Sequence, residues 1–428
     1  MTMPPSPLFL HGHATHPDLH MAVALAAAQI EAQRDTQRTA QRRAHPGATL
    51  RPLSLGWVYF SDRYGAAADA LWDELRQRWP GVAWVGAAGV GIAASGVEYL
   101  DEPAVVLMLC DLDPASFRVF NGARPLPAAG TLVGDEAWTA LVHADGRAPD
   151  LPELLRELAG RTGSGYLFGG LVSARGRAVQ LAEGVFDGGC SGVAFGRGVP
   201  LLSRVTQGCQ PVAPVHRITA AQGNLVLRLD GQPALPVLLA DLGITPDDVR
   251  AALPRLRATL AGLSDAGADV LAHRGQFGTD VRVRHLIGLD PGRQGFALAD
   301  QVEPGMQLAF CRRDAQAARR DLVRICSEIR EEVAAWGEAT TAADTLASPA
   351  THAASPASPA WTLAGALYIS CAGRGGPHFG GPSAELELVR HALGDVPLVG
   401  LFAGGEIARH HLYGYTGVLT VFLAPVAE

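Results

Sequence analysis

A glycine-rich segment near the C-terminus, residues 371–376 with the sequence Cys-Ala-Gly-Arg-Gly-Gly, has the composition of a ligand-binding turn. Glycines let backbone N–H groups come close to a ligand, and the guanidinium of Arg374 can bind a carboxylate or a phosphate through two hydrogen bonds. The segment follows an expected strand and precedes an expected helix, whose N-terminus favours an anion. We therefore expect the N–H groups of Gly373, Gly375 and Gly376 and the side chain of Arg374 to bind a small anion.

Glu406 lies beside two further glycines, Gly404 and Gly405, and could bind the ammonium group of the same ligand. Together with Arg374 it would then match the two charged ends of an amino acid. The alternative is an ion pair between Arg374 and Glu406 that only shapes the loops. The segment has neither the G-K-[ST] ending of a P-loop nor a G-x-G-x-x-G pattern, so we expect no nucleotide cofactor.

Cys371 could act as a nucleophile, because Arg374 and the helix terminus would both lower the pKa of its thiol. The competing interpretation is a small residue at the end of a buried strand. The corresponding position in the first half of the chain is Asp62, so the fold itself does not require a cysteine there. Asp62 and Arg63 either line a second or shared pocket or form an ordinary turn.

The order of elements around these residues is repeated at the two ends of the chain. Both ends contain a strand with the pattern G-x-[VL]-Y-[FI]-S, then a helix, a short strand, a glycine-rich bend and an apolar strand. Apolar runs of this kind suit strands that are covered on both faces. The expected strands are residues 56–61, 82–85 and 104–110 in the first copy and 365–370, 396–400 and 417–423 in the second.

A weaker third copy is expected around residues 165–196, and a fainter fourth around residues 285–310. Internal repeats of this kind indicate a duplicated architecture. We therefore expect an α/β protein with two related domains, each a mixed β-sheet flanked by helices, in an α-β-β-α layering. The expected segments are a helical N-terminal part (1–34), a first domain (35–236) and a second domain (237–428). Residues 337–360, rich in Ala, Thr, Ser and Pro, are expected to be a flexible insertion in the second domain.

Composition limits the classes of function. The chain of 428 residues is 48% hydrophobic and 18% charged, which provides a large core, and its net charge is -7. The absence of a basic excess argues against a nucleic-acid partner. The six cysteines lie far apart without a C-x-x-C pair, so we expect reduced thiols and no metal site. The N-terminal sequence lacks a signal-peptide pattern and no long apolar run occurs, so we expect a cytoplasmic protein without a membrane span.

Several motifs together resemble the FIST family. Residues 205–212 and 223–227 resemble the Q-G-C-x-P…G-N-x-[IV] pattern of FIST N domains. Residues 370–375, 404–407 and 414–419 resemble the C-x-G-R-G…G-E-I…T-G-V-L pattern of FIST C domains. The resemblance covers roughly residues 35 to 425. It implies a sensory module for small ligands such as amino acids, found in signalling proteins and, in eukaryotes, beside an F-box.

The sequence therefore predicts reversible binding of a small anionic or zwitterionic metabolite at the glycine-rich loops, with no cofactor. No kinase, cyclase, receiver or F-box segment is recognisable, so a separate signalling partner protein is expected to supply the output. Two alternatives remain open. The chain could be a Cys371-dependent hydrolase or transferase, or an interaction scaffold whose pocket is vestigial.

Overall fold

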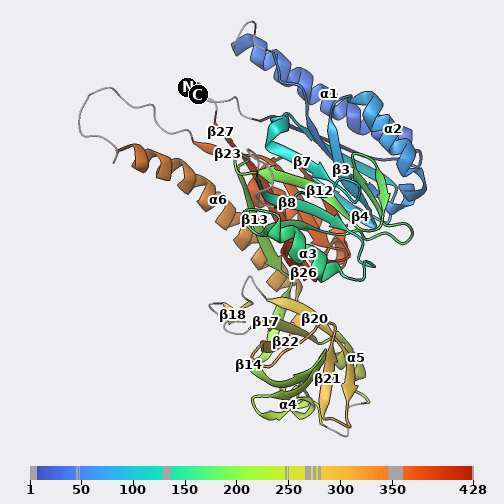
Figure 1. Cartoon of the computed structure of the whole chain (residues 1–428), viewed down its shortest axis with the longest axis vertical. Coiled ribbons are helices and arrows are strands. Elements are labelled where there is room, and N and C mark those ends of the chain that lie inside the picture. The colour runs from blue at the N-terminus through green and yellow to red at the C-terminus, as the bar shows by residue number, and fades with distance from the viewer. Residues whose placement is uncertain are drawn as a thin grey trace. The chain divides into compact units, whose positions relative to one another are not determined.

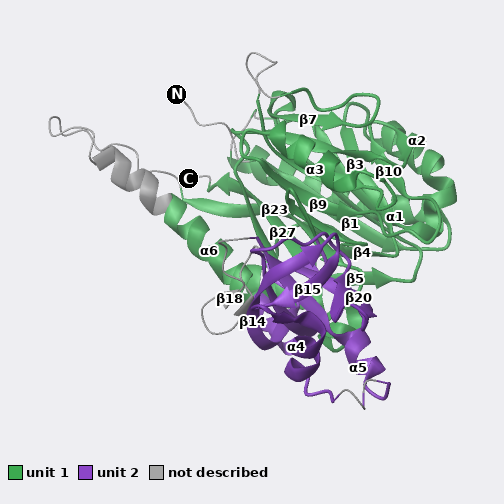
Figure 2. Cartoon of the chain, turned by 60° about the horizontal axis from the view of Figure 1, so that its bottom comes forward, with its two compact units in different colours: residues 1–205, 322–412, 417–428 green, residues 206–321, 413–416 purple. Residues whose placement is uncertain are grey.

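The structure is a computed structural model in which two compact units are distinguished (Figure 2). It describes residues 7–44, 47, 49–128, 136–245, 248, 250–265, 271–272, 276–277, 281–345 and 360–426, and for 271–272, 276–277 and 337–345 the backbone alone. Unit 1 comprises Met1–Val205, Leu322–Leu412 and Gly417–Glu428, and unit 2 comprises Thr206–Asp321 and Tyr413–Thr416. The units thus divide the chain differently from the expected segments 35–236 and 237–428, because unit 2 takes residues from both. The expected insertion at residues 337–360 lies largely outside the described residues.

Unit 1 contains three copies of one series of elements (Figure 1). The first repeat consists of β1 (Phe9–Thr15), α1 (Leu19–Ala44), β2 (Leu55–Ser61), η1 (Asp62–Ala67), α2 (Ala68–Arg78), β3 (Ala83–Gly89), β4 (Gly91–Ala94), β5 (Val97–Leu100) and β6 (Ala104–Cys110). The second consists of η2 (Pro114–Ser116), β7 (Phe117–Phe120), β8 (Ala137–Ala144), α3 (Leu151–Gly160), β9 (Tyr166–Leu171), β10 (Val179–Ala182), β11 (Val185–Asp187) and β12 (Cys190–Gly196). The third consists of β13 (Leu201–Gln207), α6 (Ala315–Thr345), β23 (Trp361–Cys371), η4 (Gly376–Phe379), α7 (Ala384–Leu393), β24 (Leu398–Ala403), β25 (Glu406–Arg409), β26 (His411–Tyr413) and β27 (Thr416–Pro425). The expected α/β class with mixed sheets and internal duplication is confirmed, and the segment expected to be a helical N-terminus contains strand β1 before helix α1.

Each repeat builds its core from the same strand pairings. The two strands around the short helix are parallel, as in β2–β3, β8–β9 and β23–β24. The last strand returns antiparallel to the first of these, as in β6–β2, β12–β8 and β27–β23. The edge strands β1, β7 and β13 then lie outside the returning strands.

Each repeat also contains a two-stranded hairpin, which is β4–β5 in the first repeat, β10–β11 in the second and β25–β26 in the third. This hairpin pairs with the sheet of another repeat. Strand β4 of the first repeat pairs with β24 of the third, β10 of the second pairs with β3 of the first, and β25 of the third pairs with β9 of the second. The result is three six-stranded sheets with one common order, β1-β6-β2-β3-β10-β11, β7-β12-β8-β9-β25-β26 and β13-β27-β23-β24-β4-β5. The three repeats therefore form a closed cycle of exchanged hairpins.

One glycine in each repeat marks the equivalence of the copies. Gly86, Gly169 and Gly400 stand in register with Val58, Val142 and Tyr368 of the neighbouring strand. A Cβ atom on these glycines would lie 1.7, 2.0 and 2.0 Å from the carbonyl oxygens of those residues. The two strands approach each other too closely at this register for any side chain.

The inner faces of the three sheets share one core. The rings of Trp57 from the first repeat and Phe195 from the second both contact Phe422 from the third, with centroids 5.4 Å apart in each case. On the opposite face of β2, Val58 and Phe60 pack in a separate apolar cluster with α1 and α2. Burial on both faces explains why the core strands are apolar throughout.

Helices cover the outer faces of the sheets unequally (Figure 1). In the first repeat α1 connects the edge strand to the first core strand and packs on β1 and β6. In the third repeat α6 precedes the first core strand and contacts β13 through an Arg204–Glu332 ion pair. In the second repeat the described residues of this connection, 121–128 and 136, form turns and extended chain instead of a helix. Within these described residues, the edge of the second sheet therefore has no counterpart of the helix that the other two repeats place there.

Unit 2 is a closed antiparallel β-barrel. Its elements are β14 (Cys209–Gln222), β15 (Leu225–Leu229), β16 (Gln232–Pro233), α4 (Ala234–Asp241), α5 (Leu253–Ala258), β17 (Leu260–Ser264), β20 (Arg282–Asp290), β21 (Gly295–Leu298) and β22 (Gln307–Arg313), with a small hairpin β18 (Leu271–Ala272) and β19 (Gln276–Phe277). The sheet order is β14-β22-β17-β20-β21-β15-β16, and an additional β14–β15 pairing closes it. The prediction of a fourth repeat at residues 285–310 is therefore wrong, since these residues form antiparallel barrel strands without the helix of a repeat.

Candidate functional site

The glycine-rich segment after β23 places its arginine inside the protein. The side chain of Arg374 is 0% exposed, and its Nε donates a 2.9 Å hydrogen bond to Oε1 of Glu385 at the start of α7. Tyr368 and Ser370 donate further hydrogen bonds to the same carboxylate, at 2.7 and 3.1 Å. Burial alone would lower the pKa of Arg374, but the charges of Glu385, Tyr368 and Glu406 and the hydrogen bond to Glu385 together outweigh it, and the pKa is raised. The partner of Arg374 is thus Glu385, and the guanidinium does not reach solvent to bind a ligand.

A second carboxylate organises the backbone of this segment. Glu98, on the exchanged strand β5, accepts hydrogen bonds from the N–H groups of Gly376 (2.7 Å), Glu385 (3.0 Å) and Leu386 (3.4 Å). Burial raises the pKa of Glu98, although these N–H groups act in the opposite direction. The N–H of Gly376 and the first turn of α7 are therefore bound by the protein's own carboxylate.

The glycines of the segment serve its packing. A Cβ on Gly375 would lie 2.6 Å from the ring of Phe402, and Gly376 has a φ of +61°. Gly373 is exposed and Cys371 is half-buried. Among the expected binding groups of this segment, only these last two are accessible from solvent.

The remaining expected site residues fall into two places. Glu406 is fully buried on β25, opposite Gly170, and its charge acts on Arg374. Asp62 accepts hydrogen bonds from the backbone N–H and the guanidinium of Arg175, at 2.8–3.0 Å, and these hold its pKa below the usual range against the opposing effect of burial. Arg63 is exposed. The structure thus brings Arg374 near Glu406 and pairs Asp62 with Arg175, a residue that the sequence did not single out.

A buried histidine in the inner core was not anticipated. Tyr59 and His143 occupy equivalent positions on β2 and β8, and the Tyr59 hydroxyl lies 3.1 Å from Nε2 of His143. Both side chains are fully buried, and burial lowers the pKa of His143 to about 3. Nδ1 of His143 has no hydrogen-bond partner among the described residues. The imidazole is therefore neutral and enclosed.

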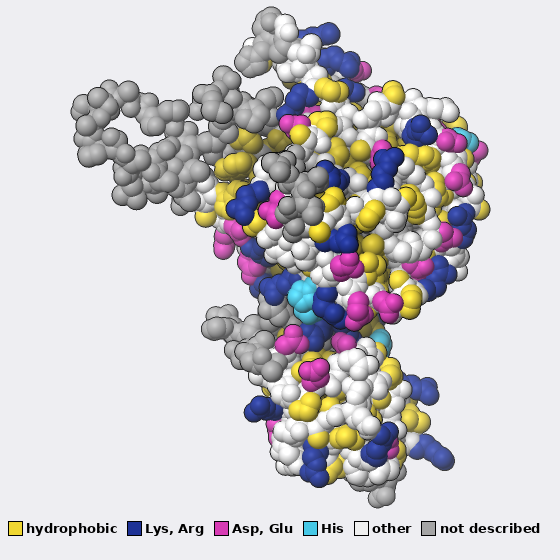
Figure 3. All heavy atoms as spheres, viewed as in Figure 1, with side chains coloured by type: hydrophobic (Ala, Val, Ile, Leu, Met, Phe, Trp, Pro, Cys, Tyr) yellow, Lys and Arg dark blue, Asp and Glu magenta, His cyan; other side chains and the backbone are white. Residues whose placement is uncertain are grey.

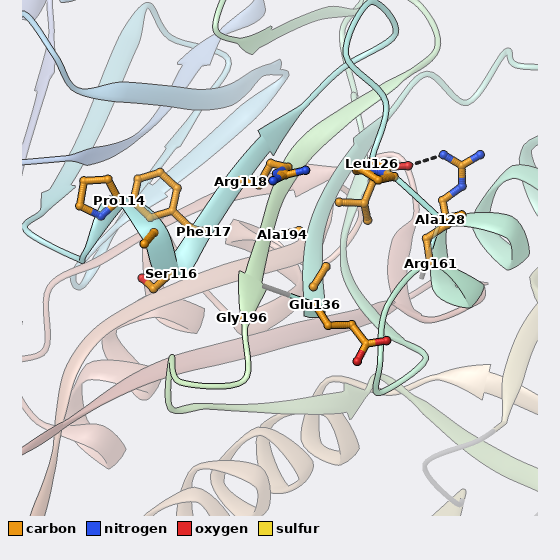
Figure 4. A pocket seen from close by; sticks show the side chains of 13 residues that line it. Pro114, Ser116, Phe117, Arg118, Leu126, Ala128, Glu136, Arg161, Ala194 and Gly196 are labelled. Carbon is orange, nitrogen blue, oxygen red and sulfur yellow. Dashed lines mark hydrogen bonds between the residues drawn. The ribbon is translucent and has the colours of Figure 1, made fainter. Parts of the chain in front are cut away.

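A pocket of about 140 Å³ lies on the outer face of the second sheet (Figure 4). It is lined by Pro114, Ala115, Ser116, Phe117, Arg118, Leu126, Pro127, Ala128, Glu136, Ala137, Arg161, Ala194 and Gly196. These residues come from η2, β7, β8, β12, the segment that joins β7 to β8, and the residue after α3. The pocket thus occupies the edge of the sheet at which the first and third repeats place a helix.

The charged side chains of this pocket differ in how they are held. Arg161 donates hydrogen bonds to the carbonyl oxygen of Leu126 and to the carboxylate of Glu157. Leu126 lies between Arg161 and Arg118 in Figure 4. Arg118 and Glu136 are exposed and form no ion pair or side-chain hydrogen bond with any described residue. One cation and one anion are therefore available to a molecule in the pocket.

Neither residue belongs to a recognisable motif, which is why sequence reasoning missed them. The sequence signal that could have indicated the pocket was a difference between the repeats, because the connection between β7 and β8 lacks the helical pattern of α1 and α6.

The face of unit 1 seen in Figure 3 has cationic and acidic side chains interspersed. The field at a binding site on this face must therefore come from a few adjacent side chains.

Two absences concern the described part of the chain. No helix there is both long and apolar enough to cross a membrane. No group of three or more His, Cys, Asp or Glu side chains in the described ranges is arranged to hold a metal ion.

The chain matches two family models. The model of the FIST N domain matches residues 54–232, and the model of the FIST C domain matches residues 234–409. The two matched segments meet within the barrel of unit 2.

The relatives of the chain include proteins of mycobacteria. An uncharacterized protein of Mycobacterium bovis is 31% identical over 233 residues, which are 53% of this chain and 51% of the relative. An uncharacterized protein of Mycobacterium tuberculosis is 28% identical over 351 residues, which are 78% of this chain and 81% of the relative. The match to the first relative thus spans about half the length of that protein.

Proposed function

The chain belongs to the FIST family, whose domains are associated with signal transduction and small-ligand sensing, and on this basis we propose that it binds a small metabolite. The ligand is an amino acid or another small anionic or zwitterionic metabolite, and it binds in the pocket between β7, β8 and α3. The proposal keeps the ligand class expected from the sequence. The proposed site is the pocket and not the glycine-rich segment, since Arg374 is bound to Glu385.

The chemistry of the pocket suits a zwitterion. Arg118 can bind a carboxylate through two hydrogen bonds, and Glu136 can bind an ammonium group. Phe117, Leu126 and Ala194 supply apolar walls. A cavity of ~150 Å³ accommodates a molecule as large as benzene, so a pocket of about 140 Å³ suits a small metabolite.

One observation carries the proposal, namely that the pocket stands where the other two repeats have α1 and α6. A helix at this position would fill the space with side chains. The described residues of this connection, 121–128 and 136, form turns and extended chain instead, which leaves room on the outer face of a rigid sheet. Loops on rigid scaffolds are where binding sites concentrate.

The output is proposed to pass to a separate signalling partner protein through residues 121–128, which follow β7. The carbonyl oxygen of Leu126 is held by Arg161, which also lines the pocket. A ligand that competes for Arg161 would release this segment. Such a ligand shifts the conformation only to the extent that it binds one state better than the other.

The test is thermal unfolding of the purified protein against a panel of amino acids, short carboxylic acids and nucleotides. A ligand at a hundred times its dissociation constant stabilises the folded state by about 2.7 kcal/mol, which raises the Tm by about 2–4 °C or more. We expect a shift from compounds that carry a carboxylate, abolished in Arg118→Ala and retained in Arg38→Ala, which removes an exposed arginine on α1.

Two outcomes would count against the proposal. A ligand shift that survives in Arg118→Ala would place the site elsewhere. The absence of any shift would favour the scaffold interpretation, and partner capture would then be the next experiment. Turnover of a bound compound that is lost in Cys371→Ala would instead support the hydrolase or transferase alternative.

A further inference from the structure

A second cavity, of about 260 Å³, lies directly beside the proposed ligand pocket. It is lined by Phe120, Asn121, Gly122, Pro125, Leu126, Leu154, Glu157, Leu158, Arg161, Gly189 and Cys190. Most of these side chains are apolar. The lining residues come from α3 and the residue after it, from the end of β7 and the segment that follows β7, and from the start of β12. This cavity also lies on the outer face that a helix covers in the other repeats.

The two cavities share the residues Leu126 and Arg161. Leu126 is buried and belongs to the apolar cluster formed by α3 and the second sheet. The backbone of Leu126 is tied to Arg161 by one hydrogen bond to its carbonyl oxygen. A single leucine side chain and the stem of one arginine therefore stand between a charged compartment and an apolar one.

We propose that the ligand is amphipathic, with its carboxylate and ammonium groups in the pocket of Arg118 and Glu136 and an unbranched or aromatic apolar tail in the second cavity. This inference rests on the proposed function, because it assigns the tail of a ligand whose charged groups bind in the first pocket. The ligand class is an α-amino acid with a long apolar side chain.

The arrangement of the two cavities carries the inference. Apolar side chains gain free energy from leaving water, at about 0.8 kcal/mol for each buried methylene group. An apolar cavity of ~150 Å³ already binds benzene, so a cavity of about 260 Å³ can hold a hydrocarbon tail of five or six carbons. The charged pocket orients the ligand, and the apolar cavity selects for the length of its tail.

The experiment is a titration of the full-length protein with a homologous series of α-amino acids, from alanine through 2-aminobutyrate, norvaline and norleucine to 2-aminooctanoate. We expect the dissociation constant to fall about fourfold for each methylene group that becomes fully buried, which is the fold-change equivalent to about 0.8 kcal/mol. In Leu154→Trp, which fills the second cavity from the partly exposed side of α3, we expect this dependence to disappear while alanine binds as before.

The matched control is Leu253→Trp, which places the same bulky group on an exposed leucine of α5, far along the chain from either cavity lining. It should keep the dependence on tail length. Affinity that does not change along the series, or a dependence that survives in Leu154→Trp, would overturn the inference and leave the proposed function intact. If no member of the series binds, this inference fails, and the thermal-unfolding panel with its Arg118→Ala variant decides separately whether the proposed function fails too.

Discussion

His143 is held neutral by its surroundings, and this has a consequence for stability. Burial lowers its pKa to about 3, whereas a histidine in an unfolded chain titrates near 6.5. Between these two values the unfolded chain binds a proton that the folded protein does not bind. The free energy of unfolding therefore falls as the pH is lowered through this window.

We predict that the Tm of the protein decreases as the pH is lowered from 6.5 to 5, with a contribution from His143 of about 2 kcal/mol. In His143→Phe this part of the pH dependence should be lost, even though Tyr59 then loses its partner and the protein is less stable at every pH. Thermal unfolding by circular dichroism as a function of pH measures the slope. An unchanged slope in His143→Phe, compared with the exposed control His20→Gln, would contradict the prediction.

Arg374 shows how far residue types alone can predict a site. The sequence correctly indicated a turn between a strand and a helix, but the partner of the arginine, Glu385, lies on the helix that follows the turn. Glu98, which binds the N–H of Gly376, comes from the first repeat. A partner so distant in sequence follows only from the exchange of hairpins, which no local pattern reveals.

Among the individual elements, helix α1 protects the outer edge of the first sheet. The outer edge of β1 would expose unpaired backbone groups, which invite pairing with another chain. Gln33 of α1 accepts a 3.2 Å hydrogen bond from the N–H of His11 and donates one of 2.6 Å to its carbonyl oxygen. Gln29, one helical turn earlier, does the same for His13, at 3.3 and 2.8 Å. Two side-chain amides thus replace a neighbouring strand.

We predict that Gln33→Ala destabilises the protein by about 1–3 kcal/mol, because both backbone groups of His11 lose their partner at a half-buried position. It should also increase association at high concentration, since the strand edge becomes available. Chemical denaturation and light scattering measure the two effects. The control Gln37→Ala removes an exposed glutamine one turn further along α1, and an equal effect from it would refute the role of Gln33.

The core strands were predictable from their composition. Strands β2, β3, β6, β23, β24 and β27 lie where apolar runs indicated them, because burial on both faces leaves a continuous signal in the sequence. The hairpin strands were read as glycine-rich bends, since short strands such as Gly91–Ala94 contain few β-formers. Strand β1 was missed because its histidines and glycine interrupt the apolar pattern.

The whole molecule combines a three-repeat unit with an inserted barrel. The barrel lies in the chain between β13 and α6, where the first repeat has only the short connection of residues 16–18 between β1 and α1. The N–H of Gln207 donates a 2.6 Å hydrogen bond to Asp321, and the N–H of Asp314 donates one of 3.1 Å to Gly208. The two ends of the insertion are thus adjacent, which is typical of domains that can be removed without disturbing their host.

We predict that a chain in which a short Gly-Ser linker replaces residues 208–320 still folds, because unit 1 keeps all three sheets. A fragment of residues 54–232 should not fold as a monomer, because β4 and β9 lose their partners β24 and β25. Circular dichroism and size-exclusion chromatography compare the two chains. A monomeric, cooperatively unfolding fragment beside an unfolded deletion variant would refute this account of the architecture.

The exchange of hairpins also changes where damage to the molecule is felt. In a linear array of repeats, a defect weakens the repeat that carries it and its neighbours, and the terminal repeats act as caps. Here a faulty hairpin leaves its own sheet complete and removes two strands from the sheet of another repeat. Because the cycle closes, no repeat is terminal. A mutation in the hairpin of any one repeat is therefore expected to be selected by its effect on the stability of another repeat's sheet.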